Sequence, residues 1–124
     1  MKVAHLILAY KDPEQLDNLI EIMGIDEFTF FVHLDKKIDY KDFEFISARR
    51  NVIFIKNRVE ITWGSFSMNH AIIESFKEIL IHAEFDNISV ISSQHLPIKS
   101  PDEILKYLSA NKGFQFFKSI TYDN

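Results

Sequence analysis

Short apolar runs alternate with helix-forming segments along this chain, and this alternation limits the folds open to it. Buried strands are predicted at residues 3–9, 28–34, 51–55 and 88–91, with a fifth beginning at 114–117. Helices are predicted between them, at 13–23, 39–48, 67–83 and 101–112. Strands that alternate with helices form a largely parallel sheet covered on both faces. We therefore predict one α/β, Rossmann-like domain over residues 1–124, whose sheet is incomplete because the chain stops soon after a strand.

Local signals predict where several helices begin and end. The sequence DPEQ predicts an N-cap at Asp12, a proline at the first helical position and a returning Gln15, with Gly24 as the stop. The sequence SPDE is the clearest signal, because Ser100 and Glu103 can satisfy each other's backbone amides. Either Ser65 or Ser67 is expected to cap the helix that ends near residue 83. Its core face is predicted to comprise Met68, Ile72, Phe76, Ile79, Leu80 and Ala83.

Composition excludes several classes of protein. Hydrophobic residues make up 47% of the 124 residues, which excludes intrinsic disorder. The net charge of −4 argues against broad binding of nucleic acid. The absence of cysteine removes disulfides and thiolate zinc sites from consideration. No apolar run approaches 18 residues, so no membrane span is predicted.

Polar residues gather where three of the predicted strands end. The first strand is followed by Tyr10 and Lys11, the second by Asp35 and two lysines, and the fourth by the run 92–95. Ligands of open α/β sheets bind at the carboxyl ends of the strands. These residues are therefore predicted to face a ligand site, although polar loops that only cap helices would give the same pattern.

Individual candidates each have a structural alternative. Asp35 could accept hydrogen bonds from a ribose or a base, or simply pair with a neighbouring lysine. Trp63, the sole tryptophan, could stack on a base beside Gly64, or fill the core. His33 is better explained as a packed, hydrogen-bonded histidine than as a functional one.

Several common motifs are absent. The chain contains neither GxGxxG nor GxxxxGK[ST], so the usual phosphate-binding loops are missing. It also lacks the GxSxG nucleophile elbow of the α/β hydrolases. His33, Asp35, His70 and His95 show no metal-ligand spacing, so no metal site is predicted.

Three blocks in order resemble a known family. FVHLDKK, ITWGSFSMNHAII and VISSQHLPIKSPDEIL resemble the core-2/I-branching enzymes, glycosyltransferase family 14, over residues 3–108. That family includes β-1,6-N-acetylglucosaminyltransferases and protein xylosyltransferases. The resemblance implies a GT-A-type nucleotide-sugar domain that uses a UDP-sugar donor and a glycan acceptor, inverts the anomeric centre and needs no metal cofactor. The missing DxD motif agrees with metal independence.

The resemblance also implies site residues. The aspartate of the HxD block and the aromatic residue before the helix help to hold the uridine in the family, and they correspond to Asp35 and Trp63. Gly64 and the end of the first strand, Ala9 and Tyr10, are expected to line the same pocket. Arg58, Gln94 and His95 are expected to contact either the donor or the loops around it.

The sequence departs from the family pattern in two respects. Where the family has S-G-x-D-x-P, this chain has Ser93 in place of the glycine and His95 in place of the aspartate. A histidine does not supply the same fixed anion. The family's catalytic glutamate and diphosphate-gripping basic residues lie later in the domain, so the catalytic base is expected beyond Asn124. This chain is expected to supply the uridine half of the site and to be inactive alone.

Other interpretations stay open. A non-catalytic nucleotide-binding or assembly module that needs a second chain is the main alternative, and a small hydrolase or a receiver-like domain is a weaker one. We expect self-association, a homo-oligomer formed through an apolar edge near 114–117. A cytoplasmic or membrane-peripheral bacterial enzyme of surface polysaccharide biosynthesis is expected, since no anchor is present.

Overall fold

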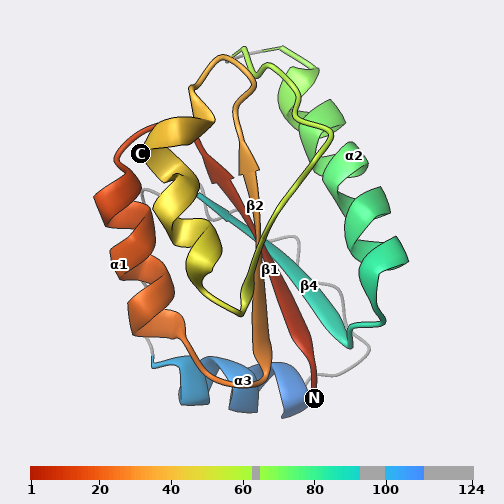
Figure 1. Cartoon of the computed structure of the whole chain (residues 1–124). Helices are drawn as coiled ribbons and strands as arrows, with labels where there is room; N and C mark the ends of the chain where they lie inside the picture. The colour runs from red at the N-terminus through yellow and green to blue at the C-terminus, as the bar shows by residue number, and fades with distance from the viewer. Residues whose placement is uncertain (63–64, 93–99, 111–124) are drawn as a thin grey trace.

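Four parallel strands form the centre of the molecule. The computed structural model describes residues 1–62, 65–92 and 100–110 (Figure 1). The strands follow the order β3-β2-β1-β4, and every neighbouring pair is parallel. In chain order the elements are β1 (Val3–Ala9), α1 (Pro13–Met23), β2 (Phe28–Leu34), the 3-10 helix η1 (Tyr40–Ala48), β3 (Val52–Phe54), α2 (Ser67–His82), β4 (Asn87–Ser92) and α3 (Pro101–Ala110). The predicted parallel α/β sheet is confirmed.

Helices cover both faces of the sheet because alternate strand residues point to opposite sides. One core joins Val3 and Ile7 of β1 and Phe30 of β2 with apolar residues of α1, η1 and α3. The other core joins Leu6 and Phe31 with Ile79 of α2 and its neighbours. Figure 1 shows α1 and α2 on opposite sides of the strands. The near-continuous apolar runs predicted for buried parallel strands therefore serve two cores.

The predicted helix ends are partly correct. Ser100 and Glu103 form the expected capping box: the Ser100 backbone N donates to Oε1 of Glu103 (3.3 Å), and the Glu103 N donates to Oγ of Ser100 (3.2 Å). Asp12 is the N-cap residue and Pro13 begins the helix, as predicted, but the Asp12 side chain makes no cap hydrogen bond and its backbone is left-handed, with φ of 54°. Gly24 ends α1 with φ of −71°, so the stop does not use glycine's left-handed freedom.

The core face predicted for α2 needs correction. Leu80 is 65% exposed, and the buried line of the helix instead runs through Ala71, Ser75 and Ile79. Two of the three buried positions are small residues, and Oγ of Ser75 donates to the Ala71 carbonyl at 2.7 Å. The face of α2 that contains Ala71, Ser75 and Ile79 is turned toward the core, and Leu80 faces outward. Phe66 is the N-cap, while Oγ of Ser65 accepts from the Ser67 backbone N (3.1 Å).

The strand order creates a switch point between β1 and β4. The chain places β2 and β3 on one side of β1, then crosses to place β4 on the other. Strand β3 is shorter than the predicted 51–55, although the Ile55 N still donates to the Val32 carbonyl (2.8 Å). The predicted strand at 114–117 lies outside the described residues. Within the described ranges, no helix is both long and apolar enough to cross a membrane.

Candidate functional site

The carboxyl ends of β1 and β2 meet at one edge of the sheet. The Asp35 backbone N donates to the Ala9 carbonyl at 2.9 Å, so two of the predicted site residues are direct neighbours. The strand tips and the start of α2 lie at the same end of the molecule (Figure 1). Because β1 adjoins the switch point, this edge is where an open α/β sheet binds ligands.

Asp35 is an organising carboxylate at this edge. It is only 4% exposed. Its Oδ1 accepts from the backbone N atoms of Lys37 (3.0 Å) and Ile61 (3.4 Å), and its Oδ2 accepts from Nζ of Lys37 (2.9 Å). Burial alone raises the pKa of Asp35, but these hydrogen bonds outweigh it and hold the pKa below its ordinary value. Asp35 is therefore an anion, and both of its oxygens are already engaged.

Residues 55–62, which lead from β3 toward α2, lie against the end of β2; we call them the β3–α2 connection. The Val59 N donates to Nε2 of His33 (2.9 Å), and the Lys36 N donates to the Val59 carbonyl (3.3 Å). Two residues on, the Ile61 carbonyl accepts from Nζ of Lys37 (2.5 Å). The end of β2 and the β3–α2 connection are thus joined by a backbone hydrogen bond and by side chains, beyond the point where strand β3 ends.

Arg58 fastens the connection to the loop that follows β2. Its Nε donates to the Leu34 carbonyl (2.9 Å), and its Nη2 donates to the carbonyls of Asp35 (2.9 Å) and Ile38. The guanidinium therefore binds three backbone carbonyls, one at the last residue of β2 and two in the loop that follows it. The sequence predicted donor or loop contacts for this residue, and in the structure its contacts are with the protein's own loop.

The end of β1 contributes an aromatic residue and a strained turn. Nζ of Lys11 lies 5.5 Å from the centroid of the Tyr10 ring, within the range of a cation–π contact. Asp12 follows with its left-handed backbone, and its carbonyl accepts from the N atoms of Gln15 and Leu16. Left-handed backbone in a residue other than glycine costs about 1 kcal/mol or more. The turn from β1 into α1 is thus held in a constrained form beside Ala9.

Other predicted site residues lie outside the described residues: Trp63, Gly64, Gln94 and His95. Among the described residues, no group of three or more His, Cys, Asp or Glu side chains is arranged to hold a metal ion.

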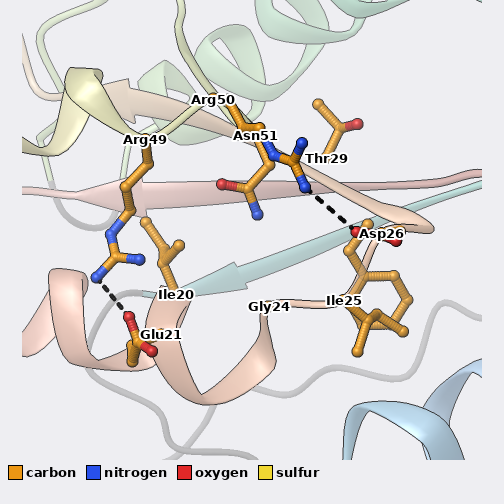
Figure 2. A pocket seen from close by; sticks show the side chains of 10 residues that line it. Ile20, Glu21, Gly24, Ile25, Asp26, Thr29, Arg49, Arg50 and Asn51 are labelled. Carbon is orange, nitrogen blue, oxygen red and sulfur yellow. Dashed lines mark hydrogen bonds and ion pairs between the residues drawn. The ribbon is translucent and has the colours of Figure 1, made fainter.

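A cavity of about 660 Å³ lies at the opposite, amino-terminal edge of the sheet. Figure 2 shows its lining, where Arg49 reaches Glu21 (2.9 Å) and Arg50 points toward Asp26 (3.5 Å). A hydrogen bond from Arg49 to Asp17 raises the pKa of Arg49. These charges already pair with each other, and no residue predicted for the site lies here. We therefore place the candidate site at the carboxyl edge despite the volume of this cavity.

The sequence did not predict that His33 and Asp35 of the HxD block bind the same segment of the chain. His33 and Asp35 are two residues apart, a spacing that puts both side chains on the same side of an extended chain, and both accept from amides of the β3–α2 connection, at Val59 and Ile61. The signal available was the i, i+2 spacing of two polar residues at a strand end, followed by lysines. What it lacked was the partner segment, which lies 24 to 26 residues further along the chain.

Comparisons with known proteins agree with this architecture. The family described as Core-2/I-Branching enzyme matches residues 3–124. Xylosyltransferase oxt of Drosophila melanogaster is 26% identical over 108 residues, which cover 84% of this chain and 12% of that protein. Xylosyltransferase 2 of Homo sapiens is 24% identical over 130 residues, which cover the whole chain and 15% of that protein. The chain thus spans about an eighth of the length of these relatives.

The family match covers all of the described elements, including the edge where Ala9 meets Asp35. It also extends through the three segments that lie outside the described residues, two of which contain Trp63 and His95. The chain belongs to the Core-2/I-branching enzyme family of glycosyltransferases.

Proposed function

We propose that this chain forms the uridine-binding half of an inverting glycosyltransferase that takes GlcNAc or xylose from a UDP-sugar and transfers it to an acceptor sugar. The observation that carries the proposal is the family match over residues 3–124, joined with the adjacency of Ala9 and Asp35 at the switch-point edge. The named relatives are xylosyltransferases, which supports a sugar nucleotide as donor. Their identity of about a quarter does not choose between the two donors.

The chemistry follows from inversion in one step. A carboxylate deprotonates the acceptor hydroxyl, and that oxygen attacks C1 of the donor sugar on the face opposite the nucleotide. The C1–O bond to UDP breaks as the new bond forms, and cationic groups stabilise the diphosphate that leaves. We assign no catalytic base within residues 1–124. The residues proposed for the uridine are Tyr10, Asp35 and Trp63.

Asp35 fits this proposal through its charge and its surroundings. A carboxylate has about four lone-pair sites, and within the described part of the chain three donors occupy Asp35. One acceptor position therefore remains for an imide or a hydroxyl of the nucleotide. The fixed bonds to Lys37 and Ile61 hold that position in place before the ligand arrives, which lowers the cost of binding.

Metal independence, self-association and place of action are proposed with it. The lack of a DxD motif supports transfer without a divalent cation. We propose a homo-oligomer and a cytoplasmic or membrane-peripheral place of action in polysaccharide biosynthesis. Light scattering of the purified chain tests the homo-oligomer, and a monomer would contradict it.

Calorimetric titration with UDP tests the central proposal. We expect binding by the wild type that is unchanged by EDTA, and loss of at least tenfold in affinity in Trp63→Ala and Asp35→Asn. Asparagine keeps the size of Asp35 and an oxygen for the Ile61 amide, so the fold is retained while the charge is removed. Arg50→Ala, at the far edge, is the matched control and should bind as the wild type does.

ADP provides the specificity arm of the same titration. Binding of UDP but not ADP supports a uridine site, whereas equal binding would indicate a general diphosphate site. No binding by a folded wild type would contradict the assignment of the uridine half to these residues. Binding without any transfer to acceptors by the longest natural chain would favour the non-catalytic nucleotide-binding module.

A further inference from the structure

We infer that His33 and Glu78 are positioning residues, which hold the β3–α2 connection against the carboxyl edge and so keep Asp35 ready for the nucleotide. The inference rests on the function proposed above and assigns roles to two side chains that it does not use. Neither residue needs to touch the ligand. Both act through the connection, one from strand β2 and one from helix α2.

His33 binds the middle of the connection. Its side chain is fully buried and its Nε2 accepts from the Val59 N at 2.9 Å. Because Nε2 accepts, the proton of the neutral ring sits on Nδ1, which has no hydrogen-bond partner in the part of the chain that the structure describes. Burial lowers the pKa of His33, so the ring is neutral at pH 7. A phenylalanine would fill the same space, so the specific contribution of histidine is the acceptor.

Glu78 binds the start of the connection. Its Oε1 accepts from the Lys56 N (2.9 Å) and its Oε2 accepts from the Asn57 N (2.7 Å). One carboxylate on the helix thus satisfies two successive backbone amides. Glu74, one turn earlier, accepts from Nδ2 of Asn57 at 3.0 Å. Helix α2 therefore fixes the place where the chain leaves β3.

Both anchors bind the connection just before Ile61, whose amide donates to Asp35. The connection is bound at 56 and 57 by Glu78, at Val59 by His33, and at Ile61 by Asp35 and Lys37. Beyond Ile61, the Thr62 N donates to Oγ of Ser67 at 2.8 Å. If residues 56–59 were released, the Ile61 amide would no longer be presented to Asp35. The loss would reach the nucleotide through the carboxylate, with no direct contact.

The charges around His33 predict how the anchor responds to acid. Asp35 and Glu78 favour its protonated form, whereas Arg58 and burial oppose it. Protonation would put a second N–H on the ring at Nε2, where it would face the Val59 N–H. Because burial holds the pKa of His33 below its ordinary value, the anchor should be lost only as the pH falls through that lowered pKa.

Two readouts test the inference: titration with UDP, and quenching by acrylamide of the fluorescence of Trp63, the only tryptophan and the residue next to Thr62. We expect His33→Phe and Glu78→Ala to lose tenfold or more in UDP affinity and to change the quenching constant. His33→Gln retains an acceptor near the position of Nε2, so it should bind within threefold of the wild type. Its affinity should also vary less than that of the wild type between pH 7 and pH 5.

Matched controls separate positioning from general stability. Glu84→Ala removes a carboxylate just beyond α2 and should leave both readouts unchanged. Circular dichroism establishes that each variant is folded, and Glu78→Ala keeps the test decisive if His33→Phe does not fold. Wild-type affinity and quenching in a folded Glu78→Ala variant would overturn the inference.

Failure of the proposed function gives a different result. A folded wild type that does not bind UDP, but whose Trp63 quenching responds to both variants, would contradict the uridine site while retaining the role of the anchors. A wild type that binds UDP with equal affinity in all variants would retain the uridine site and contradict the positioning role.

Discussion

The two ends of the sheet are held together in different ways. At the carboxyl end, buried or half-buried side chains bind backbone groups: His33 binds an amide, and Arg58 binds three carbonyls. At the amino end, Arg49 and Arg50 bind side-chain carboxylates around an open cavity. Bonds to backbone groups fix the course of the chain, whereas surface ion pairs leave it free to adjust. The candidate site was therefore placed at the edge with more fixed polar contacts, and not at the edge with the larger cavity.

Among the variants that distinguish the two ends, the largest expected effect is at Arg58. Arg58→Ala removes the donors to the carbonyls of Leu34, Asp35 and Ile38. Several half-buried acceptors lose a charged donor, so the free energy of unfolding should fall by about 3 kcal/mol. Urea denaturation followed by circular dichroism measures the loss.

Arg49→Ala is the matched variant at the amino end. Arg49 pairs with the partly exposed Asp17 and the exposed Glu21, so the free energy of unfolding should fall by about 1 kcal/mol or less. Arg58→Lys should recover less than half of the Arg58 loss, because an ammonium lacks the planar fork. Equal losses at the two arginines would contradict the contrast between the two ends.

A buried histidine away from both ends should affect stability without affecting ligand binding. His5 is 2% exposed, and burial lowers its pKa to about 4. Its folded pKa lies below the unfolded value of 6.5, so its contribution is full above pH 6.5 and is lost as the pH falls to 4. This difference between the folded and unfolded pKa corresponds to a fall of about 3 kcal/mol in the free energy of unfolding.

Chemical denaturation between pH 7 and pH 4 measures this loss. Replacement of both polar partners, His5→Phe with Ser89→Ala, avoids leaving the Ser89 hydroxyl alone, since Nδ1 of His5 lies 2.5 Å from its Oγ. The double variant should show a smaller loss in acid, with the rest due to His33 and the carboxylates. UDP affinity at pH 7 should not change, in contrast to the variants at His33.

The sequence predicts the elements better than the contacts between them. Apolar runs predict all four described strands, and each predicted end lies within one residue of the observed end. The sequence pattern fails at Leu80, since apolar spacing alone does not reveal that the buried face of α2 runs through the small residue Ala71 and the polar Ser75. For Asp35 it left a ligand contact and a lysine pair both open, and the structure shows the pair with Lys37. The Ile61 amide was missed because long-range partners leave no periodic signal.

Backbone conformation gives a third comparison, between Asp12 and Gly24. Asp12 at the carboxyl end has φ of 54°, whereas Gly24 at the amino end has φ of −71°. Asp12→Val places a β-branched side chain in left-handed backbone and should cost about 1–2 kcal/mol. Asp12→Gly should be within about 0.5 kcal/mol of the wild type, because relief of strain offsets the greater freedom of the unfolded chain.

Gly24→Ala tests the other half of this comparison by the same denaturation experiment. A Cβ at position 24 would lie 3.2 Å from the Ile20 carbonyl oxygen, a tight contact that opposes the entropic gain. The two effects should nearly cancel, so that stability changes by less than about 0.5 kcal/mol. If Gly24→Ala lowered the free energy of unfolding more than Asp12→Val does, the constrained turn would lie at the amino end of the sheet instead.

The smallest expected effect is the dependence on salt, and it separates the two kinds of arginine contact most directly. Surface ion pairs are screened in 1 M salt, where the Debye length is about 3 Å. The small loss in Arg49→Ala should therefore disappear in 1 M sodium chloride, and Arg50→Ala, whose side chain is 91% exposed, should show no loss at either concentration. The loss in Arg58→Ala should persist, because its acceptors are uncharged carbonyls whose hydrogen bonds salt does not replace. If salt removed the Arg58 loss as well, the guanidinium would be acting as a charge near Asp35, and the rigidity ascribed to the β3–α2 connection would need another source.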